Sequence, residues 1–178
     1  RLPRVEVYRG FVFACLSEEV EDLSDFLGEI AGTIDNMCDR SPEGAVEVTG
    51  LNCHRFIHPC NWKFFLENLH DAMHPMCAHA GTSDAVRNYL STMPEGTNPP
   101  SEAEIIDPFG GSYDFFDSMG VTGLDKGHGY MGGEKSIFSH FEMYPEYLQA
   151  MNSAYGKQRT EEILSFNRHN ACCYPSST

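Results

Sequence analysis

Hydrophobic and polar positions recur along this chain with the spacings of short strands and amphipathic helices. β-Branched and aromatic residues on both sides of Arg9 and Gly10 predict a strand over residues 5–16, with a bend or bulge at the glycine. Apolar residues at helical spacings predict a helix over residues 24–38, within which Gly28 lowers the helix propensity. The N-terminal region therefore combines both kinds of element.

The middle of the chain combines a strand-like stretch with a helix that directly follows it. Residues 45–60 favour a strand, and Asn61 can cap the next helix by accepting hydrogen bonds from the free amides of its first turn. We expect this helix to extend from Trp62 to about Met73, with an apolar side that packs into the core.

The rest of the chain is expected to alternate between helices, turns and strands. The expected elements are a helix capped by Thr82 or Ser83 and ending near Met93, a proline- and glycine-rich loop over 94–100, short strands and turns over 107–133, a strand over 135–143, helices over 145–155 and 160–166, and a strand over 168–174. This alternation permits an α+β fold.

Composition narrows the class of protein. The chain has 178 residues, 41% hydrophobic and 21% charged, which suits one globular domain or a fragment of one. A net charge of −14 with scattered basic residues argues against nucleic acid as a partner. No apolar run approaches the roughly 20 residues that cross a bilayer, so no membrane association is expected. The seven cysteines form no CxxC pair, which predicts reduced thiols in a cytoplasmic protein.

Residues 61–79, NWKFFLENLHDAMHPMCAH, contain the candidate chemistry. Asp71, His74 and His79 form the pattern D-x2-H-x4-H. On an ideal helix, which advances about 100° per residue, His79 would point about 140° away from His74. Pro75 predicts a kink or stop directly after His74, which would bring both imidazoles to one ion. Imidazole suits iron, zinc and copper alike, whereas two histidines plus a carboxylate indicate non-haem Fe(II).

These residues also have ordinary structural interpretations. Asp71 and the two histidines could form a polar helix end whose hydrogen bonds are satisfied locally. A zinc cluster is conceivable in the segment before the helix, but a strand would point neighbouring residues to opposite faces, which favours a structural role. The residues of that conceivable cluster are Cys53, His54, His58 and Cys60.

The string from residue 61 to 79 resembles the iron-binding helix of Rieske non-haem iron aromatic-ring-hydroxylating oxygenase α subunits. The family pattern is close to NWK-x3-EN-x2-(D/E)-x2-H-x4-H, and this chain matches it at every fixed position. The flanking stretches VEVYRGFVFACL, DLSDFLG, AYGKQRTEEIL and RHNACCYPS are similar to the family as well, and residues 95–135 match it least.

The resemblance implies a fold and a domain organisation. It implies an α+β, helix-grip fold (Bet v1-like or TBP-like), in which an antiparallel sheet curves around helices. Residues 1–20 would be a strand pair from the end of the Rieske [2Fe–2S] domain, and residues 21–178 a catalytic domain truncated at its C-terminus.

The resemblance also implies roles for particular residues. His74 and His79 would be metal ligands, Asp71 would bridge electron transfer from a neighbouring subunit's cluster, and Asn68 would lie near the iron. The third ligand would be an acidic residue beyond Thr178, in preference to three carboxylates within the chain, Asp114, Asp117 and Glu142. Side chains that could line a substrate pocket are Leu69, Met73, Cys77 and His128.

The implied function is that of a terminal oxygenase component. It would activate O2 at mononuclear Fe(II) and hydroxylate an organic, preferably aromatic, substrate by monohydroxylation, dihydroxylation or oxidative demethylation. Electrons would pass from NAD(P)H through a reductase, a ferredoxin or both, and then a [2Fe–2S] cluster. No C-x-H…C-x2-H pattern for that cluster is present, so we expect it upstream of Arg1 and expect this fragment alone to be inactive.

The resemblance further implies a homotrimer, α3 or α3β3. Two other interpretations stay open: a non-catalytic helix-grip module that binds a small ligand, and a zinc hydrolase with two histidine ligands.

Overall fold

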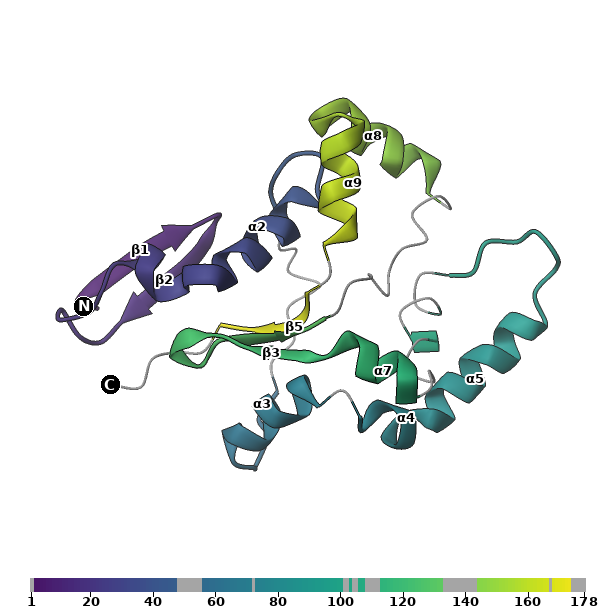
Figure 1. Cartoon of the computed structure of the whole chain (residues 1–178), viewed down its shortest axis with the longest axis horizontal. Coiled ribbons are helices and arrows are strands. Elements are labelled where there is room, and N and C mark those ends of the chain that lie inside the picture. Colours follow the sequence, from purple (N-terminus) through teal and green to yellow (C-terminus); the bar gives the residue numbers. More distant parts are fainter. Residues whose placement is uncertain are drawn as a thin grey trace.

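A computed structural model of the chain shows helices around two small antiparallel sheets (Figure 1). The structure describes residues 2–47, 56–71, 73–100, 103, 106–107, 113–132, 144–166 and 168–173. The α+β class predicted from the sequence is confirmed. No helix in these ranges combines the length and the apolar character that crossing a membrane requires.

The chain begins with a β-hairpin. Strands β1 (Arg4–Tyr8) and β2 (Phe11–Cys15) pair antiparallel. Arg9 and Gly10 between them have φ values of 49° and 89°. Two consecutive positive φ values are typical of the two-residue turns that reverse the chain in hairpins. The hydrophobic pattern alone predicts one strand with a bend at the glycine, which is wrong because the bend is a full reversal. The strand pair that the resemblance implies at the N-terminus is confirmed.

Two short helices follow the hairpin and pack against it. They are α1 (Leu23–Leu27) and α2 (Ala31–Asp39), joined by a 3-10 turn (Gly28–Ile30). Gly28 has φ 48° and ψ −129°, which interrupts the single helix that the sequence predicts here. The buried residues of this region pack against aromatic side chains of the hairpin; they are Leu27, Ile30 and Ile34.

The central sheet supports the helix with the candidate site. Its strands β3 (Val121–Gly123), β4 (Gly129–Met131) and β5 (His169–Cys172) lie in that order and are antiparallel. Helix α3 (Trp62–His70) contacts both β4 and β5. Burying one face of an antiparallel sheet under a helix is a common solution for α+β proteins.

Helices α4 (Pro75–Ala78), α5 (Ala80–Ser91) and α7 (Tyr113–Met119) lie beyond α3 at the same end of the molecule (Figure 1). A small core joins α7 to β4 and consists of Phe116, Met119 and Met131. α7 occupies a stretch where the sequence predicts only short strands and turns. α5 begins before the predicted caps, so that Thr82 and Ser83 lie inside it.

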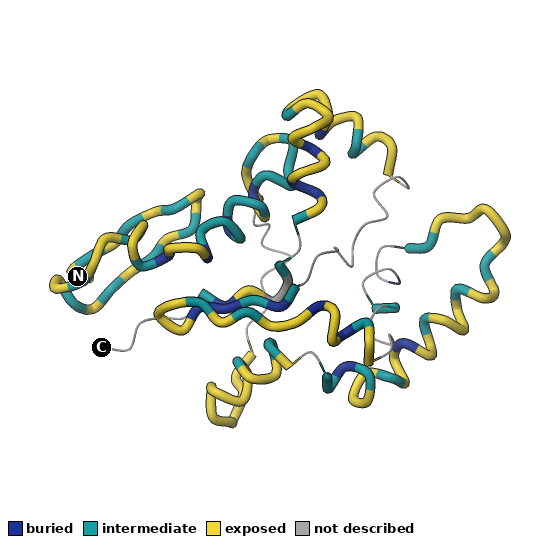
Figure 2. Tube along the Cα trace, in the orientation of Figure 1, coloured by how far each residue is buried: buried dark blue, intermediate teal, exposed yellow. Residues whose placement is uncertain are grey.

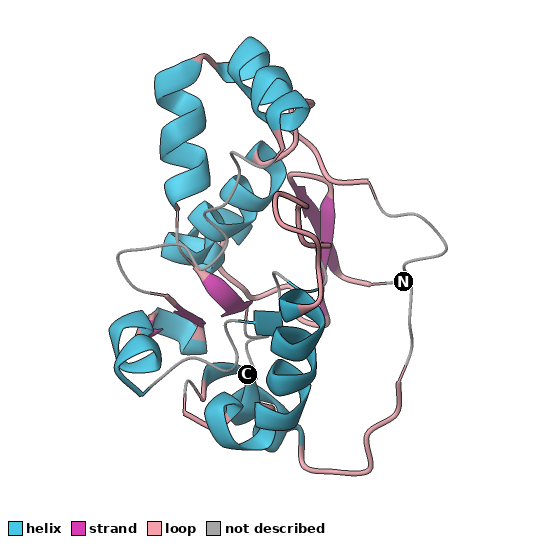
Figure 3. Cartoon of the chain, turned by 90° about the vertical axis from the view of Figure 1, so that its right-hand side faces the viewer, coloured by secondary structure: helices cyan, strands magenta, loops and turns pink. Residues whose placement is uncertain are grey.

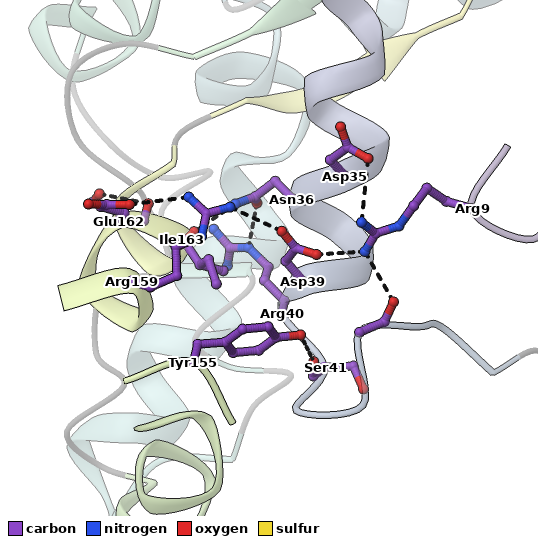
Figure 4. A network of polar contacts seen from close by, with 12 residues as sticks. Arg9, Asp35, Asn36, Asp39, Arg40, Ser41, Tyr155, Arg159, Glu162 and Ile163 are labelled. Atoms are coloured by element: carbon purple, nitrogen blue, oxygen red, sulfur yellow. Dashed lines mark hydrogen bonds and ion pairs between the residues drawn. The ribbon is translucent and has the colours of Figure 1, made fainter. Parts of the chain in front are cut away.

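Helices α8 (Pro145–Tyr155) and α9 (Lys157–Ser165) form a helical hairpin at the upper end of the molecule in Figures 1 and 3. Both were predicted, with Gly156 (φ 78°) between them. Their buried core comprises Met151, Ile163 and Leu164. Polar contacts join this hairpin to α2 and to the turn after it. Asn36 of α2 donates to the Ile163 carbonyl at 2.7 Å, and the Tyr155 hydroxyl donates to the carbonyl of Ser41, just beyond α2, at 2.7 Å (Figure 4).

Two predicted strands cannot be compared in full. The described ends of the stretch over 45–60 have no strand, and residues 48–55 lie outside the described residues, as does the whole stretch over 135–143. The strand predicted at the C-terminal end is present as β5. Figure 2 shows that buried positions are short stretches on several elements, while α3 and α5 are exposed along most of their length.

Candidate metal centre

Helix α3 begins where the sequence predicts and ends three residues earlier. The Asn61 side chain accepts a hydrogen bond from the Lys63 amide at 3.0 Å, which confirms the predicted cap. The helix ends at His70, and Asp71 takes an extended conformation with φ −84° and ψ 100°. The chain therefore leaves the helix between the first and second members of the D-x2-H pair.

The break lies at Asp71 and not at Pro75. His74 has helical backbone angles (φ −62°, ψ −29°), and Pro75 is the first residue of α4. Proline is well tolerated there, because the first turn of a helix needs no amide donor and its fixed φ suits the helix. The prediction that Pro75 disturbs the backbone of His74 was wrong. The short helix α4 separates His74 from His79.

Asp71 stabilises this break with its own carboxylate. The Asp71 Oδ1 accepts hydrogen bonds from the Met73 amide at 2.8 Å and the His74 amide at 3.2 Å. The hydrogen bond from the Met73 amide is the largest cause that holds the pKa of the Asp71 carboxyl below its usual range. The bond from the His74 amide and the nearby His74 ring lower this pKa further. The carboxylate is thus ionised at neutral pH and caps the turn that carries His74.

The rings of His74 and His79 lie close together. Their centroids are 5.3 Å apart and the ring planes are inclined by 64°. A metal lies about 2.1 Å from an imidazole nitrogen and so about 3.2 Å from the ring centre, which puts two rings on one ion about 5 Å apart. The observed separation is compatible with two ligands of a single ion.

Hydrogen bonds orient the His74 ring. Its Nδ1 lies 3.0 Å from the Asp71 carbonyl oxygen and 3.5 Å from Asp71 Oδ2, so Nδ1 carries the proton and donates. Its Nε2 then accepts from the Asn68 side-chain amide at 3.1 Å. This tautomer leaves a lone pair on Nε2, which is the nitrogen that a metal would bind once Asn68 moves aside.

The site is open to solvent. His74 retains 22% of its side-chain exposure and Asp71 retains 47%. A depression of about 600 Å³ adjoins the end of α3 and is lined by Phe64, Glu67, Asn68, His70 and Asp71. A ligand or another chain can therefore approach Asp71 from this side.

The remaining candidate pocket residues have different surroundings. Met73 packs against the small core of α7 and β4, Leu69 is half-buried, and Cys77 is exposed. His128 is 4% exposed, and its Nε2 donates to the Phe26 carbonyl oxygen at 2.8 Å. Its burial thus has a structural explanation, and the pocket role of these four residues stays a prediction.

The donor set is incomplete among the described residues. In the ranges that the structure describes, no group of three or more His, Cys, Asp and Glu side chains is arranged to hold a metal. Asp114 and Asp117 lie on α7 and belong to no such group. Glu142, Cys53 and His54 lie outside the described residues. Sequence reasoning did not single out Gly129, because its contact with His70 arises only from tertiary packing.

Fold and site together describe an α+β protein with a two-histidine candidate metal centre at the end of a helix on an antiparallel sheet. Among curated proteins, the chain is similar to α subunits of dioxygenases. The chain is 35% identical over 104 residues to biphenyl 2,3-dioxygenase subunit alpha of Rhodococcus jostii RHA1, covering 56% of this chain and 21% of that protein. It is 37% identical over 92 residues to benzene 1,2-dioxygenase subunit alpha of Pseudomonas putida, covering 52% and 19%.

A third relative aligns over nearly the whole chain. Toluate 1,2-dioxygenase subunit alpha of Pseudomonas putida is 27% identical over 180 residues, which cover 99% of this chain and 36% of that protein. The chain thus spans about a fifth of the length of the first two relatives and 36% of the third. No protein-family model matches it.

Proposed function

We propose that this chain carries the mononuclear iron site of a terminal oxygenase α subunit, which activates O2 and hydroxylates an aromatic substrate. The observation that carries the proposal is the pair of histidine rings, 5.3 Å apart, at the end of α3. The similarity to α subunits of aromatic dioxygenases supports iron in preference to another metal at this pair.

His74 and His79 would hold the ion through ring nitrogens. Bound Fe(II) would supply the redox chemistry with O2 that amino-acid side chains lack. Asp71 keeps the proton of His74 on Nδ1, so that the Nε2 lone pair stays directed away from the backbone. The Asn68 amide holds the same ring from its other side until metal binds.

Asp71 would also connect the site to a second metal centre. Its carboxylate is ionised and 47% exposed, so a neighbouring chain can reach it. The resemblance to Rieske oxygenases supports a role in electron transfer from a [2Fe–2S] cluster, supplied with electrons from NAD(P)H by a reductase, a ferredoxin or both. It equally supports assembly as α3 or α3β3, in which neighbouring subunits share the site.

Metal binding by histidine variants tests the proposal. The purified protein is titrated with Fe(II) under anaerobic conditions in competition with a chromogenic chelator. His74→Ala and His79→Ala should each weaken binding by at least about tenfold, because each removes a ligand. His58→Ala is the matched control, since His58 is exposed at the other end of α3, where it stacks on Phe65 at 5.8 Å.

The outcome separates the competing functions. Fe(II) affinity that is unchanged in both variants would refute the proposed site. Tight zinc without iron, bound by the same two histidines, would favour a hydrolase. Absence of metal binding together with uptake of a small apolar compound would favour a non-catalytic binding module.

A further inference from the structure

His70, the last residue of α3, lies where the helix of the proposed metal site meets the central sheet. Its ring faces Gly129 of β4: a Cβ added to Gly129 would lie 3.6 Å from Cε1 and 3.7 Å from Nε2 of His70. Because Asp71 follows directly and leaves the helix, the His70 ring is the last contact between α3 and β4 before the site begins.

Gly129 is a glycine for reasons of space. Gly129 does not have a positive φ, so residues other than glycine could adopt its backbone conformation. An added Cβ would, however, lie 3.0 Å from the carbonyl oxygen of Thr122 on the neighbouring strand β3. Ordinary contact distances are about 3.5–4.0 Å, and a backbone oxygen cannot turn away as a side chain can. A Cβ at 129 would therefore press on the backbone of β3 at Thr122, and it would lie in ordinary van der Waals contact with the imidazole of His70.

Packing stability alone does not account for a histidine at position 70. Its Nε2 is buried and has no hydrogen-bond partner within the described part of the chain. A buried polar nitrogen without a partner costs about 1–3 kcal/mol, and an apolar side chain of similar size avoids this cost. The position of the ring, next to the residues that orient His74, gives it a second use.

We propose that His70 is a positioning residue of the metal site, an inference that rests on the function proposed above. Its ring packs on Gly129 and so sets the distance between the C-terminal end of α3 and strand β4. The Asp71 carbonyl and the Asn68 amide hold the two nitrogens of His74 and lie within two residues of His70. A displacement of His70 therefore moves both hydrogen-bond partners of His74 together.

Two glycine variants test this role. Gly129→Ala presses on the Thr122 carbonyl and so shifts the part of β4 against which the His70 ring packs, whereas Gly123→Ala, at the residue paired with Gly129 across β3 and β4, is the matched control because its Cβ would meet nothing within 4 Å. We expect Gly129→Ala to weaken anaerobic Fe(II) binding by about tenfold, the range for groups that orient metal ligands, and Gly123→Ala to leave it unchanged. Adding His70→Ala to Gly129→Ala should restore part of the affinity, because the shifted strand can then move into the space that the ring leaves without displacing the end of α3.

A second measurement distinguishes positioning from general destabilisation. The ¹⁵N imidazole signals of His74 and His79 in metal-free protein should shift in Gly129→Ala and in His70→Met, and not in Gly123→Ala. His70→Met should unfold at the same temperature as the wild type or higher, because it removes the unpaired nitrogen and keeps the bulk. A purely structural role would lower the unfolding temperature without moving the His74 signals.

The proposal is overturned if His70→Met and Gly129→Ala leave the His74 signals where they are in the wild type. It is also overturned if the double variant loses as much affinity as the two single changes multiplied together. Wild-type protein that binds no Fe(II) would refute the proposed function instead, and the imidazole signals would still decide the role of His70. Should Gly129→Ala fail to fold, His70→Met gives the same decision.

Discussion

Replacing Asp39 by asparagine should loosen the attachment of the N-terminal hairpin to the helices behind it. Asp39, at the end of α2, accepts a hydrogen bond from Arg9 of the hairpin turn at 2.6 Å and one from Arg159 of α9 at 3.2 Å (Figure 4). The asparagine variant keeps an acceptor for one arginine and loses the negative charge that both arginines share. Three elements far apart in the sequence thus depend on a single carboxylate.

The burial of the partners sets the magnitude. The Asp39 side chain is 15% exposed and that of Arg9 is 31% exposed, so this pair is partly shielded and contributes about 1.5 kcal/mol. Arg159 is 54% exposed, and solvent screening makes its contribution smaller than that of Arg9. Because asparagine retains one acceptor, we expect Asp39→Asn to lower the free energy of unfolding by about 1–2 kcal/mol.

Urea unfolding at low and high salt provides the assay. The difference between Asp39→Asn and wild type should shrink in 1 M salt, where the screening length is about 3 Å. Glu161→Gln is the control, because its ion pair with Lys157 is 3.8 Å long and exposed on α9 and should contribute less than about 0.5 kcal/mol. Equal losses in the two variants, or a loss in Asp39→Asn that does not depend on salt, would refute the reasoning.

Two further predictions concern Asp71 and His128. The pKa of Asp71 is lowered in the folded chain, so its stabilising effect is present above the unfolded value of about 3.9 and is lost as pH falls through the lower folded value. Asp71→Asn should therefore lower the unfolding temperature at pH 7 and lose this effect near pH 2; a deficit independent of pH would contradict the role of the charge. His128→Ala should cost about 2–4 kcal/mol in urea unfolding, because it opens a cavity and removes the hydrogen bond to the Phe26 carbonyl, whereas a cost below about 0.5 kcal/mol would show that this contact is unimportant.

Several features of the fold followed from local patterns. The cap at Asn61, the helix from Pro145 to Tyr155, the interruption at Gly156 and the C-terminal strand all depend on residues within a few positions of one another. The local pattern missed the reversal at Arg9 and Gly10, because a non-glycine residue with positive φ has no distinct sequence signal. At Arg9 the turn is held by the guanidinium group, which bonds to Asp39 and to the Gly44 carbonyl.

The sequence predicted which residues form the candidate site, but it did not predict the backbone conformation that brings them together. The spacing of Asp71, His74 and His79 requires a break in the helix, and proline was the obvious cause. In the folded chain the Asp71 carboxylate stabilises the break by accepting hydrogen bonds from the amides of Met73 and His74. Pro75 begins a new helix. Proline can end one helix or begin the next, and the sequence around Pro75 does not distinguish between these two positions.

Residue types and their spacing were thus sufficient to locate the helix, its cap and the pair of histidines, because capping and periodicity act over a few residues. Three features could be found only in the folded chain: the tautomer of His74, the packing of His70 on Gly129, and the position of Asp39 between two arginines. Each of these depends on how far apart two backbone segments come to rest. That distance is set by the packing of residues distant in sequence, which no local pattern records.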